Sequence, residues 1–172
     1  MNEPELTPED LTHLRRCVDL ARQALADGDE PFGSVLVAAD GTVLAEDRNR
    51  VASGDATRHP EFELARWAAA NLTPEQRATA TVYTSGEHCP MCSAAHGWVG
   101  LGPIVYASSS EQLAGWLSEL GVPPSPVRAL PVRQIAPAVE VRGPVPELAE
   151  RVHELHRRFH GSSTSDDRIA RR

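Results

Sequence analysis

Residues 84–92 read TSGEHCPMC, and the fold can be worked out from this stretch in both directions. A run of β-forming residues, TATVYT at 79–84, leads into it, and a segment typical of a helix, 90–101, follows it. Cys89 and Cys92 therefore lie where a strand gives way to a helix. Both sulfurs can face one point there, and the positive end of the helix helps to keep them ionised. The spacing predicts a metal site at a strand–helix junction.

A second motif supplies the ligand that two cysteines lack. His59 begins the segment HPEFELARWAAANL, 59–72, whose Ala, Leu, Glu and Arg content predicts a helix. Zinc prefers thiolate and imidazole ligands, and a catalytic zinc has three protein ligands and one position for water. His59, Cys89 and Cys92 form such a set. Glu61 follows the histidine by two residues, close enough to reach a metal-bound water without binding the metal.

The flanking sequence predicts an alternation of helices and strands. The expected elements are a helix from Thr7 to about Gly28, strands over 34–39, 42–45 and 104–107, and a helix over 111–120. Asp40 and Gly41 join the first two strands and favour the tight turn of a hairpin. Strands that alternate with helices in the second half imply parallel pairing and a three-layer α/β/α arrangement.

The C-terminal third is harder to interpret. Seven prolines lie between residues 122 and 146, which leaves room for one short strand, at 133–136 or at 139–142. A last helix is expected over 146–160. The remaining residues, 161–172, are small, polar and charged, so we expect a disordered tail.

Composition limits the class of protein. With 172 residues, 41% hydrophobic and 24% charged, the chain should form a single globular domain over residues 1–160. The formal net charge of −7 would repel a phosphate backbone, so nucleic acid is a disfavoured partner. The N-terminus has no positive leader, and no stretch approaches the ~18 apolar residues of a membrane span. We therefore expect a cytoplasmic protein without a membrane partner.

The combined motifs resemble the cytidine and nucleobase deaminase superfamily. Its signature is a His or Cys, any residue and Glu, followed later by Pro, Cys, two residues and Cys, as in HPE at 59–61 and TSGEHCPMC at 84–92. PFGSVLV at 31–37 and Asn49 resemble its guanine deaminase and nucleoside deaminase branch. The similarity runs from about Leu11 to Leu120. It implies a cytidine-deaminase-like fold with a central mixed sheet of five strands.

The resemblance also implies roles for individual residues. Zinc would activate a water molecule that replaces the amino group of the base, and Glu61 would move protons between water, ring and leaving ammonia. Asn49 would orient the ring, and Phe32 would pack on the base or on the pocket wall. Pro60 and Ser85 complete the expected substrate contacts. Relatives are commonly dimers or larger, so a homodimer is expected.

Two positions depart from the family pattern. His88 precedes the first cysteine where proline is usual, so the loop that leads into the site can differ in shape. Pro60 stands where alanine is usual between ligand and Glu. In the family, the backbone N–H at that position often donates to an acceptor on the base, and proline has no N–H. We therefore expect a substrate without an acceptor there, which weakens the case for cytosine or cytidine.

Several functions remain open. The leading interpretation is hydrolytic deamination of a purine such as guanine, of a purine-like triazine, or of the corresponding nucleoside. The alternatives are a tRNA adenosine deaminase, a cytosine or cytidine deaminase, and a zinc-stabilised binding module without turnover. In that last case His96 could serve as a fourth ligand, since it lies one helical turn after Cys92.

The remaining chemistry-bearing residues have simpler interpretations. His96 is expected to be a satisfied core or pocket-wall histidine, His88 a loop residue without a catalytic role, and Cys17 a small buried hydrophobe. Three tryptophans are expected in the core or an interface: Trp67, Trp98 and Trp116. Of these, Trp98 is the best placed to approach the pocket. Three histidines of the last helix predict a polar face, with metal binding as the alternative: His153, His156 and His160. The resemblance to guanine deaminases implies that Arg157, Arg158 and Phe159 could cover a neighbouring active site.

Overall fold

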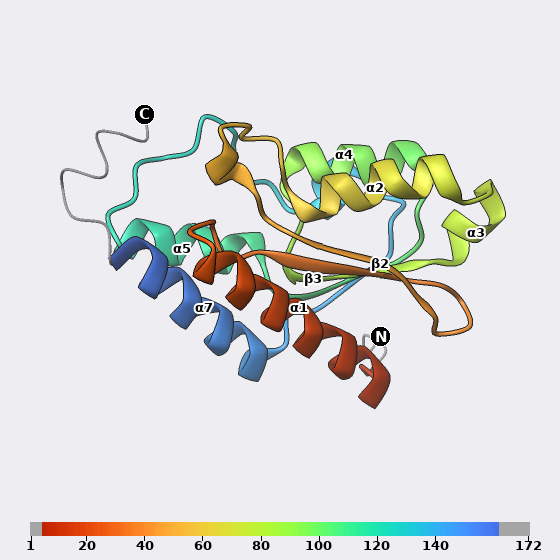
Figure 1. Ribbon diagram of the computed structural model, residues 1–172, viewed down its shortest axis with the longest axis horizontal. Coiled ribbons are helices and arrows are strands. Elements are labelled where there is room, and N and C mark those ends of the chain that lie inside the picture. The colour runs from red at the N-terminus through yellow and green to blue at the C-terminus, as the bar shows by residue number, and fades with distance from the viewer. Residues whose placement is uncertain (1–4, 162–172) are drawn as a thin grey trace.

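The computed structural model describes residues 5–161 and contains one mixed sheet in the order β2-β1-β3-β4-β5. Helices cover both faces of this sheet (Figure 1). The strands are β1 Gly33–Val37, β2 Val43–Arg48, β3 Thr81–Gly86, β4 Ile104–Ser108 and β5 Val141–Arg142. This architecture confirms the expected three-layer α/β/α fold with five strands.

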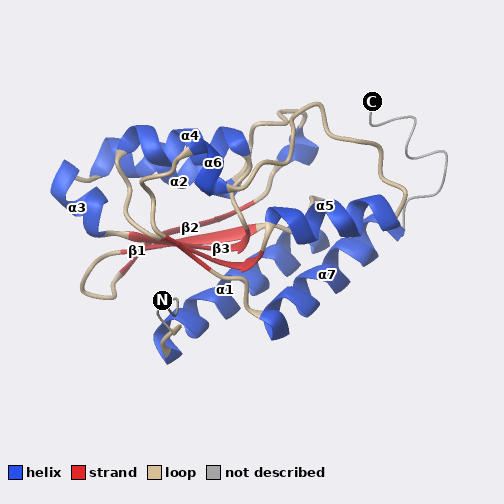
Figure 2. Ribbon diagram, turned by 180° about the vertical axis from the view of Figure 1, so that it is seen from behind, coloured by secondary structure: helices blue, strands red, loops and turns tan. Residues whose placement is uncertain are grey.

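The helices divide between the two faces. They are α1 Pro8–Ala26, the 3-10 turn η1 Val51–Ser53, α2 Pro60–Asn71, α3 Pro74–Thr79, α4 Pro90–Val99, α5 Ser110–Glu119, α6 Val132–Ile135 and α7 Pro146–Gly161. Seen from behind, α1, α5 and α7 lie on one side of the strands, and α2, α4 and α6 lie on the other (Figure 2). No helix within residues 5–161 is long and apolar enough to cross a membrane.

The type of strand pairing changes at β3, the central strand of the sheet. β1 pairs antiparallel with both β2 and β3, whereas β3, β4 and β5 run parallel to one another. The turn between β1 and β2 contains Gly41 at φ +87°, a left-handed conformation that glycine adopts without strain. Ser34 of β1 lies directly opposite Thr84 of β3. These two residues therefore project on the same face of the sheet.

One face is packed by α1 and α7. Thr7 and Asp10 form a capping box at the start of α1, which fixes where the helix begins. The apolar stripe of α1 includes Leu14 and Cys17, both 0% exposed, so Cys17 is the buried hydrophobe that the sequence predicted. A Cβ at Gly33 would lie 2.4 Å from Leu20 Cβ, so β1 approaches α1 this closely only with glycine.

The opposite face is packed by α2 and α4. Its buried core contains Leu36 and Val82 from the sheet and Leu64 from α2, with Trp67 packed partly buried against them. Trp116 packs in the same way against the core under α1 and α7. These two tryptophans confirm the expected core positions.

The structure differs from the sequence-based expectations at several places. β2 runs to Arg48, beyond the expected end at residue 45. Residues 74–79 form α3, which was not predicted, and β3 consequently begins at Thr81 rather than at residue 79. Segment 133–136 is not a strand, because 132–135 forms the short helix α6, and the fifth strand lies within the alternative range 139–142. The last helix extends to Gly161. The rest of the predicted tail, 162–172, lies outside the described residues.

Candidate active site

Two helix N-termini bring the predicted ligands together. His59 is the residue that precedes the first turn of α2, and Cys89 occupies the same position before α4. Cys92 lies in the first turn of α4, so the Cys-x-x-Cys spacing turns both sulfurs to one side. The N-terminus of a helix carries partial positive charge, which favours thiolates at this position.

The three donor atoms form a nearly equilateral triangle. The two Sγ atoms are 3.5 Å apart, and each lies 3.6 Å from His59 Nδ1. A tetrahedral zinc with ordinary bond lengths requires separations of roughly 3.8 Å between two sulfurs and roughly 3.6 Å between sulfur and nitrogen. Among the described residues, these three side chains lie close enough together to hold a metal ion. Donor types and spacing both fit zinc with one position left open.

The two thiols and the imidazole shift one another's pKa values. The hydrogen bond with Cys92 lowers the pKa of Cys89 to about 4, and the same contact together with burial raises the pKa of Cys92. Contact with Cys89 raises the pKa of His59 to about 8. Zinc requires two thiolates and a neutral imidazole, so binding the metal would release protons from this cluster.

Glu61 lies beside the cluster without belonging to it. Its side chain is buried, and Oε2 is 3.8 Å from Cys92 Sγ. Oε1 accepts hydrogen bonds from Thr84 Oγ1 at 2.9 Å and from Ser34 Oγ at 3.2 Å. Burial raises the pKa of Glu61 above its ordinary value, although the nearby His59 opposes the shift. A carboxyl group with a raised pKa next to a metal site suits proton transfer.

Asn49 and Phe32 lie next to each other at the ends of β2 and β1. The backbone N–H of Asn49 donates to the Phe32 carbonyl at 3.0 Å, and the buried Asn49 side chain accepts from the Val51 N–H at 3.0 Å. This second bond fixes the orientation of the carboxamide. The Phe32 ring contacts His156 edge-on, with centroids 5.0 Å apart. The structure thus brings the two residues together, and their contact with substrate stays a prediction.

Pro60 and Ser85 occupy different surroundings. Pro60 is buried as the first residue of α2 and has no backbone N–H to offer a substrate. The Ser85 hydroxyl accepts from the Gly33 N–H at 3.1 Å. Neighbouring strand residues project on opposite faces, so Thr84, and not Ser85, reaches Glu61. A substrate contact from Ser85 also stays a prediction.

The two histidines near the cysteines pack against each other. The rings of His88 and His96 meet edge-on at 5.2 Å, and both side chains are buried. His96 Nε2 lies 2.8 Å from the Gly102 carbonyl, which confirms a satisfied core histidine and keeps it out of the cysteine cluster. His88 precedes α4 in a loop, and its ring nitrogens have no hydrogen-bond partner among the described residues.

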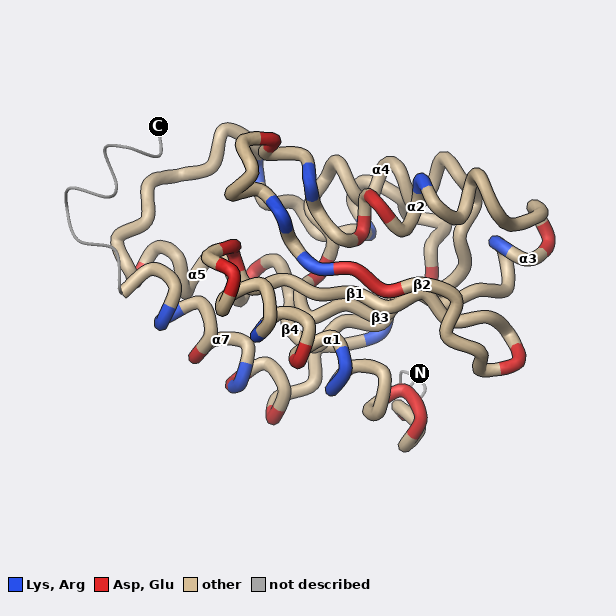
Figure 3. Tube along the Cα trace, viewed as in Figure 1, with Lys and Arg blue, Asp and Glu red and all other residues tan. Residues whose placement is uncertain are grey.

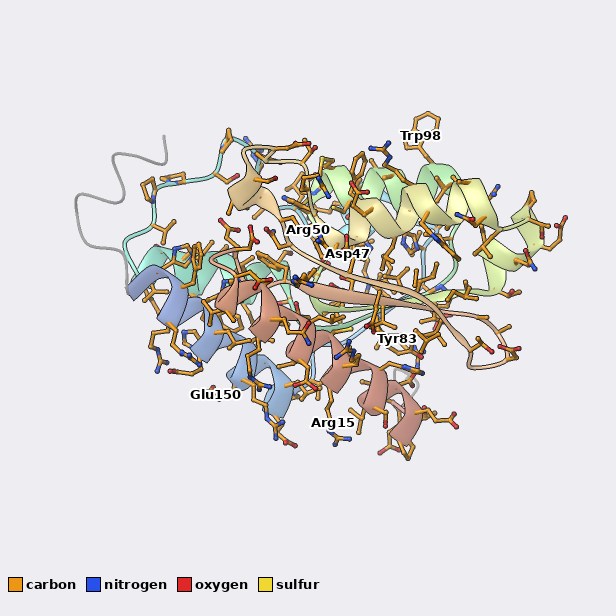
Figure 4. All side chains as sticks on the ribbon, viewed as in Figure 1. Arg15, Asp47, Arg50, Tyr83, Trp98 and Glu150 are labelled. Carbon is orange, nitrogen blue, oxygen red and sulfur yellow. The ribbon has the colours of Figure 1, made fainter. Side chains whose placement is uncertain are left out.

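The predictions for His156 and Trp98 are wrong. His156 does not belong to a polar face: it is 1% exposed, because α7 turns it toward Phe32 and Trp116. His153 stacks on Trp116 at 4.5 Å. Trp98 does not approach the site either, since it is 89% exposed and projects from α4 into solvent (Figure 4).

Three site residues escaped the sequence analysis. Ser34 and Thr84 contact Glu61, and only the pairing of β1 with β3 reveals it. Glu87 supports the loop before Cys89, because its carboxylate accepts from the backbone N–H groups of Ser110 and Val132, each at 2.9 Å. The acid inside the stretch TSGEHCPMC was the available signal for Glu87.

Comparison with known proteins identifies the family. The model of the cytidine and deoxycytidylate deaminase zinc-binding region matches residues 7–108, more than half of the chain. The protein therefore belongs to the cytidine and deoxycytidylate deaminase family. It is a hydrolytic deaminase of the nucleobase or nucleoside class, with zinc as its cofactor.

Individual relatives differ in their substrates. The chain is 36% identical over 115 residues to a probable cytosine deaminase of Schizosaccharomyces pombe, covering 66% of this chain and 68% of that protein. It is 38% identical over 105 residues to a guanine deaminase of Bacillus subtilis, covering 60% and 67%. A solved structure from work on tRNA:A34 deaminases superposes with a TM-score of 0.53 at 31% identity, covering 59% of this chain and 78% of that one.

Proposed function

We propose that this protein deaminates a free purine-type base, with guanine as the leading candidate and a purine-like triazine or a purine nucleoside as close alternatives. The observation that supports hydrolytic deamination is the His59–Cys89–Cys92 triangle with the Glu61 carboxyl 3.8 Å from one of its sulfurs. Pro60 supports a purine over cytosine, because its missing N–H cannot donate to a base acceptor. Similarity to a guanine deaminase agrees with this choice.

The chain's own residues have distinct roles in the proposal. His59, Cys89 and Cys92 would hold zinc, which supplies the Lewis acidity that makes water a nucleophile at neutral pH. Glu61 Oε2 takes a proton from the attacking water and passes it to the ring nitrogen, then takes the second proton from the newly added hydroxyl and delivers it to the departing amine. Asn49 and Phe32 orient the ring. The balance is one water consumed and one ammonia released for each amino group replaced.

Transfer RNA is a weaker candidate, although a tRNA deaminase structure is similar. A folded RNA requires several phosphate contacts, and the net charge of this chain is −7. Two arginines at the end of the edge strand β2 are already paired: Arg48 with Asp27 at 2.6 Å and Arg50 with Asp47 at 2.9 Å. Figure 3 shows acidic and basic residues interspersed along this segment.

We extend the proposal to assembly and location. The exposed Trp98 lines an open groove of mixed polar and apolar surface, together with other residues of α4 and of the segment after α6, among them Gly97 and Ala136. Such a surface supports a homodimer. The free cysteines at the site suit a reducing compartment, which supports a cytoplasmic location, and residues 1–160 would act as one deaminase domain.

The test is ammonia release from a panel of purine bases, purine nucleosides, cytosine, cytidine and aminotriazines. Zinc-loaded protein should release ammonia from a purine-type member, and Glu61→Gln should release none above background. Turnover of cytidine with an ordinary Michaelis constant would contradict the argument from Pro60. A salt-dependent shift of tRNA in a gel, with no turnover of any small molecule, would favour the RNA alternative.

A further inference from the structure

Two hydroxyl groups are buried on the face of the sheet that carries the active site. Ser34 and Thr84 lie opposite each other across β1 and β3, and both side chains are 0% exposed. Two residues farther along each strand on the same face, Leu36 and Val82 belong to the apolar core under α2. A hydroxyl in such surroundings costs free energy unless it is hydrogen-bonded. We therefore expect both hydroxyls to have hydrogen-bond partners.

Their contacts converge on one oxygen atom. Thr84 Oγ1 lies 2.9 Å from Glu61 Oε1, Ser34 Oγ lies 3.2 Å from the same atom, and the two hydroxyl oxygens are 2.9 Å apart. The other carboxyl oxygen, Oε2, is the one near Cys92 Sγ. Anchoring Oε1 on two strands fixes the rotation of the carboxyl group, and with it the position of Oε2.

We propose that Ser34 and Thr84 are positioning residues that hold Glu61 Oε1, so that Oε2 faces the metal cluster. This inference rests on the proposed role of Glu61 as the proton carrier. Two hydroxyls from adjacent strands of a buried sheet restrain the carboxyl more tightly than solvent or a flexible side chain would.

Hydroxyl groups suit a carboxyl that gains and loses a proton during turnover. A hydroxyl can donate or accept, whereas a backbone N–H can only donate. Thr84 has a second acceptor in reach, the Gly86 carbonyl at 2.9 Å. In the proposed mechanism Oε2 carries the proton, so Oε1 stays an acceptor and both hydroxyls can keep donating to it.

Thr84→Val gives the sharpest test, because valine keeps the shape of threonine and removes the hydroxyl. With guanine, or the panel member that the wild type deaminates fastest, kcat should fall roughly tenfold to hundredfold. KM should stay within about twofold, because the substrate contacts are elsewhere. Zinc per chain and thermal midpoint should stay close to the wild type. Thr84→Ser keeps the hydroxyl and should restore kcat to within about threefold.

Two further variants secure the interpretation. Thr81→Val makes the same change at the beginning of β3, away from Glu61, and should leave kcat unaltered. Ser34→Ala should lower kcat less than Thr84→Val does, because its oxygen lies 0.3 Å farther from Oε1 (3.2 against 2.9 Å). Ser34→Ala decides the matter if Thr84→Val does not fold.

Each remaining outcome overturns a specific statement. A kcat within about twofold of the wild type in both Thr84→Val and Ser34→Ala would overturn the positioning role, provided that Glu61→Gln is inactive. A loss of zinc in step with kcat would assign the hydroxyls to the metal cluster and overturn it too. An active Glu61→Gln would instead contradict the proposed role of Glu61. That result comes from the Glu61 variant alone, so it can be told apart from a failure of the Ser34 and Thr84 variants.

Discussion

Two carboxyl groups with nearly equal burial lie on opposite faces of β3. Asp10 is 5% exposed and Glu61 is 6% exposed, yet their pKa values shift in opposite directions. Burial alone would raise the pKa of Asp10, but the Tyr83 hydroxyl at 2.7 Å, the Thr7 N–H and Arg142 at 3.0 Å together hold it below its ordinary value. Glu61 is hydrogen-bonded to neutral hydroxyls, so burial prevails and its pKa rises.

The difference shows how one strand supports two kinds of site. Tyr83 and Thr84 are neighbours, and the alternation of β3 directs them to opposite faces. Asp10, tied to an arginine, stays ionised and fastens α1 to the sheet. Glu61, facing hydroxyls and a metal cluster, is left able to exchange a proton. The ion pair with Arg142 helps to hold Asp10 ionised and has no counterpart among the hydrogen bonds of Glu61, where burial has the larger effect on the pKa.

Metal removal should show the largest difference between the two faces of the sheet, because it should abolish activity on one face and leave the helices of the other in place. Treatment with a strong zinc chelator should abolish ammonia release, because the cluster would lose the metal that activates water. The apolar core under α1 and α7 contains no zinc ligand, so far-UV circular dichroism should keep most of its helical signal. Full unfolding on chelation would show that the metal stabilises the whole fold, and would contradict the division of roles between the two faces.

Glu61→Gln should give the next largest effect. Loss of the proposed proton carrier should lower kcat by about 10²- to 10⁴-fold at unchanged zinc content. The free energy of unfolding should stay equal or rise, because an amide is less costly to bury than a carboxyl group that must ionise. A marked loss of stability in urea titration would place Glu61 with Asp10 among the structural carboxyls.

Asp10→Asn should show the reverse pattern. The amide cannot replace the charge-assisted bond to Arg142, so the free energy of unfolding should fall by about 1–3 kcal/mol in urea titration. Because Asp10 lies on the far face, kcat should stay within about twofold. A large fall in kcat at full stability would contradict the division of roles between the two faces.

His156 offers a smaller test through pH. Burial, with His160 and His153 nearby, lowers its pKa from 6.5 to about 3. Below pH 6.5 the unfolded chain takes up a proton that the folded chain refuses until about pH 3, so the stability present above pH 6.5 falls as pH drops.

His156→Phe removes this titration and suits the contacts with Phe32 and Trp116. Between pH 7 and pH 5.5 the stability of the variant relative to wild type should therefore rise by roughly 1 kcal/mol, measured by urea titration at both pH values. A constant difference across this range would show that the pKa of His156 is not lowered in the folded protein.

Local sequence was sufficient for the metal cluster and much of the fold. The Cys89–Cys92 spacing is one helical turn, and His59 precedes its own helix, so each ligand's orientation follows from a helix start that the sequence marks. The same holds for α1 and for the β1–β2 hairpin. The unpredicted α3 also had a local signal, because Thr73 and Gln76 form a capping box.

Other features depended on contacts between distant segments. A four-residue helix such as α6 has too few residues to show a period, and its start is fixed by Glu87, 45 residues away, whose carboxylate accepts from the Val132 N–H. Whether His156 or Trp98 is buried depends on which helix covers it, which no spacing within α7 or α4 specifies.

Local sequence was therefore enough to predict the zinc ligands, the acid beside them and the α/β class of the fold. How that acid is held depends on contacts between distant parts of the chain. The pairing of β1 with β3 sets Ser34 opposite Thr84 and brings both to Glu61, 27 and 23 residues away in the chain. Helix starts and turns are short-range and leave a signature in neighbouring residues, whereas strand register is fixed by packing across the whole sheet.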